Sequence, residues 1–273
     1  MGFLDMIRDG AFRQFGGGRI GDGDGTPLVA VNPSKLDVSV AAGAHASLVI
    51  LHTEAGETAA EIVLEDGASL TIDDIYLAAA FSAVHIRQQG GSSCRLTSVE
   101  LQGANADYDI DLDGAGASFD ADGVFVGAGT DHCVFDLTTR HNVADCTSSS
   151  LVKGVVSGRA TGEFRGHVYV APDAQRTDAR QQSRNIELGG DAHIVTKPQL
   201  EIYADDVKCS HGATVGQIDD DAVLYMRQRG LSEADARRLQ IEGFVSDIVG
   251  RCSAGETLCG ALDEAVRSKL EEL

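Results

Sequence analysis

Cys209 and His211 are the residues whose types and spacing point most directly to chemistry in this sequence. They stand two positions apart in a segment that the residue pattern predicts to be a β-strand, where every second side chain points to the same face. A thiol and an imidazole on one face form half of a metal-binding site, because both are common ligands of transition metals. A structural interpretation stays open beside it, since free cysteine is among the most often buried residue types.

Several longer segments around this pair carry a resemblance to a known family. They are Phe164–Val170, Ala179–Leu188, Lys197–Gly216 and Leu224–Leu231. Over residues 154–249 the chain resembles the SufB/SufD family of iron–sulfur cluster assembly proteins. Gly212 favours the SufD branch, because the SufB branch is expected to carry glutamate at this position.

The resemblance implies a fold, partners and a role. The implied fold is a right-handed parallel β-helix over residues 28–218, followed by a C-terminal helical subdomain over 219–273 that docks onto a SufC-like ABC ATPase. A SufB-like subunit, or a second copy of this chain, is the implied dimer partner. The implied role is that of a scaffold subunit, not an enzyme, in a SUF-type complex that builds and transfers nascent iron–sulfur clusters.

The resemblance also implies a site at the junction between the two subunits. Cys209 and His211 are implied to hold a transient iron–sulfur cluster or iron, with His211 the stronger ligand and Glu201 a weaker additional candidate. Thiolate suits iron–sulfur units, and imidazole can complete a labile site. The alternative is a purely architectural β-helix subunit that stabilises its partner without binding metal.

The front of the chain departs from the family pattern. A helical region is expected before the β-helix, and here it is reduced to residues 1–27. We predict a short amphipathic helix from Phe3 to Phe15, followed by a Gly/Asp-rich linker from Gly16 to Gly25. A minimal system, in which the chain pairs with itself and with a SufC-like ATPase, is therefore a second possibility.

Composition narrows the classes of partner and the compartment. The chain has 22 basic and 42 acidic residues and a formal net charge of −20, which disfavours nucleic acid and anionic membrane surfaces as partners. The six cysteines show no CxxC pair, which indicates reduced thiols. No secretory signal and no apolar run of about 20 residues is present, so we expect a cytoplasmic protein without a membrane span.

Short alternating apolar runs between residues 28 and 218 predict β-strands. Turn glycines recur about every 24 residues through this region, a spacing typical of solenoid coils. These glycines are Gly43, Gly67, Gly91 and Gly116. A β-sandwich would give tighter hairpins and no such repeat, so the pattern favours a β-helix.

The period of the sequence becomes helical after Gly216. Three aspartates from Asp219 predict the start of a helix that runs to Arg229. Ser232 and Asp235 predict a capping box at the start of a second helix, which ends at Val249, and a third helix is predicted over Thr257–Leu270. The residues predicted to line one side of the second helix are Ala236, Leu239, Phe244 and Ile248.

Other motifs in the chain carry less weight. The GxGxxG match at residues 16–21 lacks a preceding strand, so it predicts a linker and not a dinucleotide site. The aspartates between Asp109 and Asp120 resemble a calcium loop, but strand-like flanks favour a solvent-facing strand. No GxxxxGK[ST] motif occurs, so we expect this chain to bind no nucleotide. Cys–His pairs involving His132, His141 or His167 are more simply explained by packing.

Overall fold

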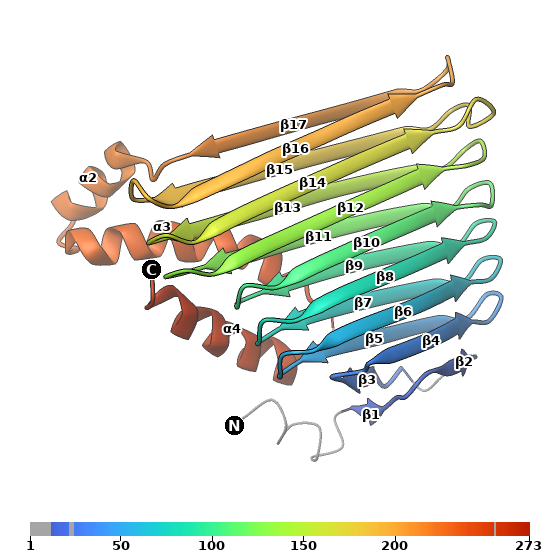
Figure 1. The fold of residues 1–273 in the computed structure, drawn as a ribbon, viewed down its shortest axis with the longest axis horizontal. Coiled ribbons are helices and arrows are strands. Elements are labelled where there is room, and N and C mark those ends of the chain that lie inside the picture. The colour runs from blue at the N-terminus through green and yellow to red at the C-terminus, as the bar shows by residue number, and fades with distance from the viewer. Residues whose placement is uncertain (1–11, 22–24, 254) are drawn as a thin grey trace.

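The chain forms a parallel β-helix with helices packed along one flank (Figure 1). The computed structural model describes residues 12–21, 25–253 and 255–273. Odd-numbered strands form a nine-stranded sheet, here sheet A, and even-numbered strands form an eight-stranded sheet, here sheet B. Every strand pairs in parallel with the strand two positions on, so each coil contributes one strand to each sheet. The predicted parallel β-helix with C-terminal helices is confirmed.

The strands lengthen along the chain. The sheet A strands are β1 (Arg13–Gln14), β3 (Leu28–Val31), β5 (His45–His52), β7 (Ser69–Tyr76), β9 (Ser93–Glu100), β11 (Ser118–Gly127), β13 (Thr147–Ser157), β15 (Asp178–Leu188) and β17 (Lys208–Gly216). The sheet B strands are β2 (Gly18–Ile20), β4 (Lys35–Val40), β6 (Glu57–Leu64), β8 (Phe81–Gln88), β10 (Asn105–Leu112), β12 (His132–His141), β14 (Thr161–Val170) and β16 (His193–Ile202).

The predicted turn glycines stack at one corner of the coils. Each has a positive φ, between 65° at Gly91 and 77° at Gly116, a region in which side chains with a Cβ are strained. The same corner continues at Asp145 and Arg176, whose φ values are 64° and 60°. The Arg176 guanidinium lies 2.5 Å from the Asp145 carboxylate, so an ion pair joins the two non-glycine turns.

The interior between the sheets is filled by alternate side chains of both sheets. It includes apolar residues such as Leu48, Ile72, Phe135 and Phe164, each at most 1% exposed. The opposite face of sheet A is also apolar over part of its length, and Val124 and Val155 there belong to a second cluster shared with the helices. Sheet A is therefore covered on both faces, as parallel sheets usually are.

Three helices follow the last strand: α2 (Asp220–Gln228), α3 (Glu233–Val249) and α4 (Glu256–Leu270). The Asp219 carboxylate accepts hydrogen bonds from the first turn of α2, and the Ser232 hydroxyl accepts one from Asp235 N at the start of α3. These caps satisfy backbone N–H groups that have no partner within the helix. The predicted helix starts at Asp219 and Ser232 are confirmed.

Buried charged contacts lock α3 and α4 to the β-helix. Lys153 of β13 is 5% exposed, and its Nζ lies 2.6 Å from Asp247 Oδ2 and 3.0 Å from the carbonyl oxygen of Phe244. Lys269 Nζ lies 2.8 Å from Asp131 Oδ2. The helices lie along the outer face of sheet A, so they share its core and leave the last coil uncovered (Figure 1).

Three expectations need correction or fall outside the described residues. Gly18–Ile20, predicted to be part of a linker, is strand β2 and pairs with β4, because parallel pairing uses backbone groups that glycine also has. The predicted helix Phe3–Phe15 lies mostly outside the described residues, and its described end contains the strand Arg13–Gln14. Leu239, predicted to lie on the same side of α3 as Ala236 and Ile248, is 51% exposed, whereas those two residues are buried.

Candidate functional site

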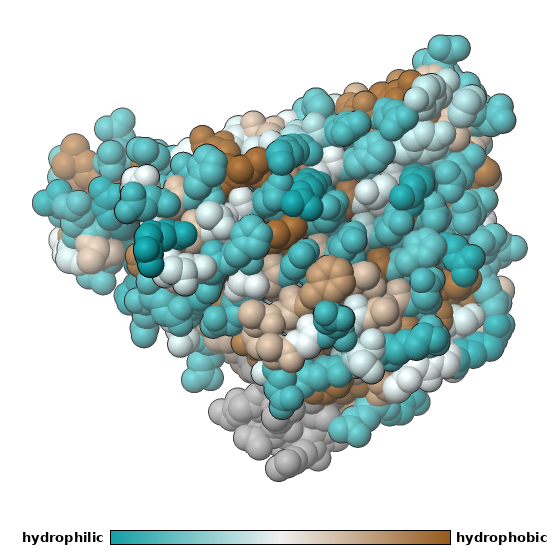
Figure 2. All heavy atoms as spheres, viewed as in Figure 1, coloured by the Kyte–Doolittle hydropathy of each residue, from teal (hydrophilic) through white to brown (hydrophobic). Residues whose placement is uncertain are grey.

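The end of the β-helix at β16 and β17 is an uncovered coil. β17 is the last strand of sheet A and β16 the last strand of sheet B, so each has one paired edge among the described strands. An edge strand presents unpaired N–H and C=O groups and is a surface for pairing with another chain. Figure 2 shows a largely hydrophilic surface with small apolar groups along this edge. The exposed large apolar residues there are Ile202, Tyr203 and Val215.

Cys209 and His211 both lie on the inward-facing side of β17. Their register partners in β15 are Ala179 and Gln181, which are buried at 0% and 1% exposure. Cys209 is half-buried against the cluster that contains Ala179 and Val168, whereas His211 is exposed. The two donors therefore share one face, and that face is open because no further described coil covers it.

The Cys209 thiol is not activated in the isolated chain. Burial raises its pKa, and a hydrogen bond from the backbone of Ala179 opposes this effect only in part. Lys208 is on the other face of the strand by alternation, so its ammonium group does not help to form the thiolate. Burial therefore disfavours the thiolate form of Cys209 in the isolated chain.

Glu201 is not brought together with this pair. It lies in β16, where Leu200 packs into the interior, so alternation directs Glu201 to the outer face of sheet B. There its Oε1 accepts a hydrogen bond from the Tyr203 hydroxyl at 2.7 Å, and its Oε2 lies 3.2 Å from His167 Nε2. The Tyr203 hydroxyl, together with His167, holds the pKa of Glu201 below its ordinary value.

The pair Cys209–His211 is a half-site. Among the residues that the structure describes, no group of three or more His, Cys, Asp or Glu side chains has a geometry that could hold a metal ion. Two protein ligands leave open positions on a metal, so any site built here needs ligands from a cargo or a partner.

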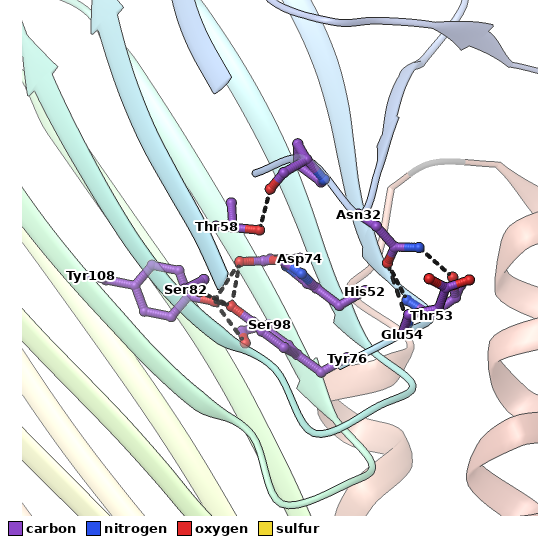
Figure 3. Close-up of polar contacts among 11 residues, drawn as sticks. Asn32, His52, Thr53, Glu54, Thr58, Asp74, Tyr76, Ser82, Ser98 and Tyr108 are labelled. Atoms are coloured by element: carbon purple, nitrogen blue, oxygen red, sulfur yellow. Dashed lines mark hydrogen bonds and ion pairs between the residues drawn. The ribbon is translucent and has the colours of Figure 1, made fainter. Parts of the chain in front are cut away.

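A second polar group lies deep inside the β-helix and is not evident from the sequence motifs. The carboxylate of Asp74 is fully buried and is 2.9 Å from His52 Nε2, 2.9 Å from the Tyr76 hydroxyl and 2.9 Å from the Tyr108 hydroxyl. Figure 3 shows these side chains, together with Ser82 and Ser98, turned toward one another. The two tyrosine hydroxyls donate to Asp74 and the His52 ring nitrogen lies within hydrogen-bond distance, so this buried polar group has its partners.

Glu100 lies beside this network but takes no part in it. It is 0% exposed, is the register partner of Tyr76, and neither carboxyl oxygen has a hydrogen-bond partner in the described part of the chain. Burial raises the pKa of Glu100 well above its ordinary value, and the nearby Asp74 raises it further. Burial therefore favours the protonated, neutral form of the Glu100 carboxyl.

The remaining Cys–His combinations do not form nucleophilic pairs. His141 Nε2 is 2.8 Å from the Ser148 hydroxyl, and burial lowers the pKa of this histidine to about 4. His132 bonds to Thr161 at the surface, while the neighbouring Cys133 is 0% exposed. Packing explains these residues, as the sequence suggested.

These features define a class of protein: a parallel β-helix with flanking helices and an uncovered terminal coil that carries a thiol and an imidazole. None of the helices within the described residues is long and apolar enough to cross a membrane. Residues 24–244 match the family described as "SUF system FeS cluster assembly, SufBD core domain". The chain belongs to this SufB/SufD family, and within it resembles SufD.

Relatives of established name support this assignment. The chain is 46% identical to the iron–sulfur cluster assembly protein SufD of Escherichia coli over 108 residues, which are 40% of this chain and 26% of that protein. It is 47% identical to a SufBD family protein of Synechocystis over 102 residues, which are 37% of this chain and 22% of the relative. A SufBD family protein of Mycobacterium bovis is 30% identical over 278 residues, 92% of this chain and 66% of the relative. The matches thus span from about a quarter to two thirds of these relatives.

Proposed function

We propose that this protein is a non-ATPase scaffold subunit of a SUF-type complex that builds and transfers nascent iron–sulfur clusters. It pairs with a SufB-like subunit, or with a second copy of itself, and with a SufC-like ATPase. The observation that carries the proposal is the presence of Cys209 and His211 on the open face of the last coil, in a chain of the SufB/SufD family.

The chemistry of the half-site suits a transient cargo. A thiolate and an imidazole bind iron, and two ligands from this chain leave the other positions to sulfide and to the partner subunit. Iron binding also favours loss of the Cys209 proton, which burial otherwise retains. Glu201 faces the outer side of sheet B, so we propose for it no more than contact with a partner at the rim of the junction.

The unpaired edge of β17 and the exposed apolar side chains beside it fit a protein partner. Ile202 is 38% exposed, Tyr203 57% and Val215 43%, and they lie on the two strands that end the sheets or just beyond them. Addition of strands from a second β-helix would pair the free backbone groups and cover these side chains. Such a contact would enclose Cys209 and His211 between two subunits.

The first two helices fit the docking of an ATPase. Leu224 and Tyr225 of α2 and Leu239 of α3 are each more than half exposed, and large exposed apolar side chains are typical of a surface that binds a partner. The lock between Lys153 and Asp247 fixes α3 to sheet A, so a force applied to α3 reaches the β-helix directly. We propose that nucleotide-driven movement of the ATPase changes the junction at β17 through this contact.

A second candidate function is purely architectural. The raised pKa of Cys209 and the presence of just two donors at the described site favour a subunit that shapes its partner and binds no metal. The two functions differ in what happens when the donors are removed.

Anaerobic reconstitution of the complex with the SufB-like and SufC-like partners tests the ligand role. Cys209→Ser and His211→Ala are expected to reduce the amount of cluster formed while the complex still assembles in size-exclusion chromatography. Ser210→Ala is the matched control, because Ser210 is exposed on the opposite face of the same strand. Clusters at the wild-type level in both site variants would leave the architectural function as the better account.

Point variants test the docking surface without disturbing the core that α3 and α4 share with sheet A. Leu224→Glu combined with Tyr225→Ser is expected to weaken binding of the SufC-like ATPase, measured by calorimetry, at least tenfold. Glu57→Gln, on the exposed face of sheet B, is the control and should bind as the wild type does. Unchanged binding by the double variant would refute docking at this surface.

A further inference from the structure

Gln181 lies directly beneath His211 in the neighbouring coil. The two residues are register partners in β15 and β17, and neighbouring strands lie about 4.8 Å apart. Both side chains are on the inward-facing side, two positions from Ala179 and Cys209 respectively. The layer of the interior below the imidazole is thus occupied by the side chain of Gln181.

The amide of Gln181 has hydrogen-bonding capacity that the chain does not use. The residue is 1% exposed, and its Nε2 has no hydrogen-bond partner among the residues that the structure describes. Leaving a buried amide group unpaired costs about 1–3 kcal/mol. A polar group left in this state beside an open site is a group available to a ligand or to another side chain.

Sheet B keeps room for this amide. Gly166 of β14 lies opposite, and a Cβ at that position would be 2.4 Å from Gln181 Nε2 and 2.6 Å from its Oε1. In the next coil Pro198 is the register partner of Gly166, and proline has no backbone N–H to donate. The layer above the amide is therefore made by His211 and Pro198, and of these the imidazole alone offers a side-chain donor or acceptor.

We propose that Gln181 is a positioning residue that hydrogen-bonds one ring nitrogen of His211 and so turns the other nitrogen toward the cargo. This inference rests on the ligand role proposed for His211. A histidine that binds metal through one nitrogen keeps a proton on the other, and a hydrogen-bond acceptor at that N–H fixes the tautomer and the ring orientation.

The side chain of Gln181 can meet this need. An amide carries both a donor and an acceptor, and a 180° rotation exchanges their positions. Because Nε2 makes no hydrogen bond in the described chain, this rotation breaks none at that atom. Gln181 thus presents its oxygen to the ring N–H of His211, and the imidazole is held in one orientation.

The test compares Gln181→Met with the wild type in the whole chain. Methionine matches glutamine in length but cannot hydrogen-bond to the ring. Two readouts are used: the ratio of the two neutral tautomers of His211 by ¹⁵N NMR above the titration range of histidine, and the affinity for Co²⁺ by spectroscopic titration. We expect one tautomer to predominate in the wild type, a mixture in the variant, and Co²⁺ affinity about tenfold lower.

Ser183→Ala is the matched control. Ser183 is buried on the same face of β15, but its register partner is Ala213, so its removal should change neither readout. Gln181→Glu keeps an acceptor oxygen and should restore the single tautomer, while a loss of packing alone would not be rescued by it. Thermal unfolding identifies any variant that fails to fold.

The outcomes separate this inference from the proposed function. Equal tautomer ratios in the wild type and in Gln181→Met would overturn the role of Gln181, whatever the metal affinity. Equal Co²⁺ affinity of the wild type and His211→Ala would overturn the ligand role of His211, and with it the positioning role. A change of tautomer in Gln181→Met together with weaker Co²⁺ binding in both variants supports both.

Discussion

Replacement of Glu100 by glutamine is expected to stabilise the protein, and increasingly so as the pH rises. Glu100 is buried with neither oxygen paired to a described residue, and burial and Asp74 raise its pKa. Between the ordinary glutamate pKa of about 4.3 and the raised folded-state pKa, the folded chain holds a proton at Glu100 that the unfolded chain has lost. The contribution of this group to stability is therefore full at low pH and falls as the pH rises.

The size of the effect follows from this linkage. Between the two pKa values, each pH unit removes up to about 1.4 kcal/mol from the stability of the wild type, and glutamine has no proton to lose. The difference in unfolding free energy between Glu100→Gln and the wild type should therefore grow with pH, by up to about 1.4 kcal/mol per pH unit, until the pH reaches the raised folded-state pKa. Other titrating groups are common to both chains and cancel in the difference.

Asp74→Asn is the matched comparison in the same core. Asp74 accepts from Tyr76 and Tyr108 and contacts His52, so its neutralisation leaves buried donors without a charged acceptor. We expect a loss of about 3–5 kcal/mol at pH 7. The assay is urea unfolding followed by circular dichroism at several pH values. Parallel stability curves for the wild type and Glu100→Gln would show that Glu100 is ionised or solvated in the folded protein, and the reasoning would fail.

Three further predictions concern the turns, the helix contacts and the histidines. Gly91→Ala should lower the unfolding free energy by about 1–2 kcal/mol, because φ at this residue is 65°; Gly212→Ala, with negative φ and no described heavy atom within 4 Å of the added Cβ, is the neutral control in the same urea assay. Lys153→Met should speed amide hydrogen exchange in α3 and destabilise the fold by about 1–3 kcal/mol, since it removes the buried contacts to Asp247 and to the Phe244 carbonyl; exchange in α3 at the wild-type rate would contradict this. In an NMR titration His141 should protonate at about pH 4 because burial lowers its pKa, so its contribution to stability falls as the pH drops below about 6.5. His85 should titrate above its ordinary value, because burial lowers its pKa less than its hydrogen bonds to Asp111 and Glu61 raise it; titration of the two histidines at the same pH would refute both assignments.

The sequence predicted those parts of the fold that depend on a particular residue type at a particular position. A left-handed turn favours glycine at a fixed position in every coil, so Gly43 to Gly116 reveal the repeat directly. The start of α3 at Ser232 is marked in the same way, because capping favours a short side chain with an acceptor oxygen at one position. The shared face of Cys209 and His211 also follows from the strand period alone.

Other features depend on contacts between coils, so they could not be predicted from local residue patterns. The strands Arg13–Gln14 and Gly18–Ile20 are held by backbone pairing with later strands, which gives no side-chain pattern in a glycine-rich segment. The outer position of Glu201 follows from its strand register, whereas its place in a matched motif carried no such information. One signal was available for the buried network: Asp74 alternates with the apolar Ile72 and with Tyr76, which places a carboxylate on an inward face.

Among the described coils the last one contacts a single neighbouring coil, and this affects how the proposed cargo would leave. In a solenoid each coil is stabilised mainly by the coils next to it, so local opening is easiest at an end. Cys209 and His211 lie on a strand that is paired along one edge among the described strands, while the contacts of Lys153 and Lys269 hold the helices to the middle of the molecule. Under the proposed function, fraying of β17 would release a cargo bound by these two residues while the earlier coils stay folded.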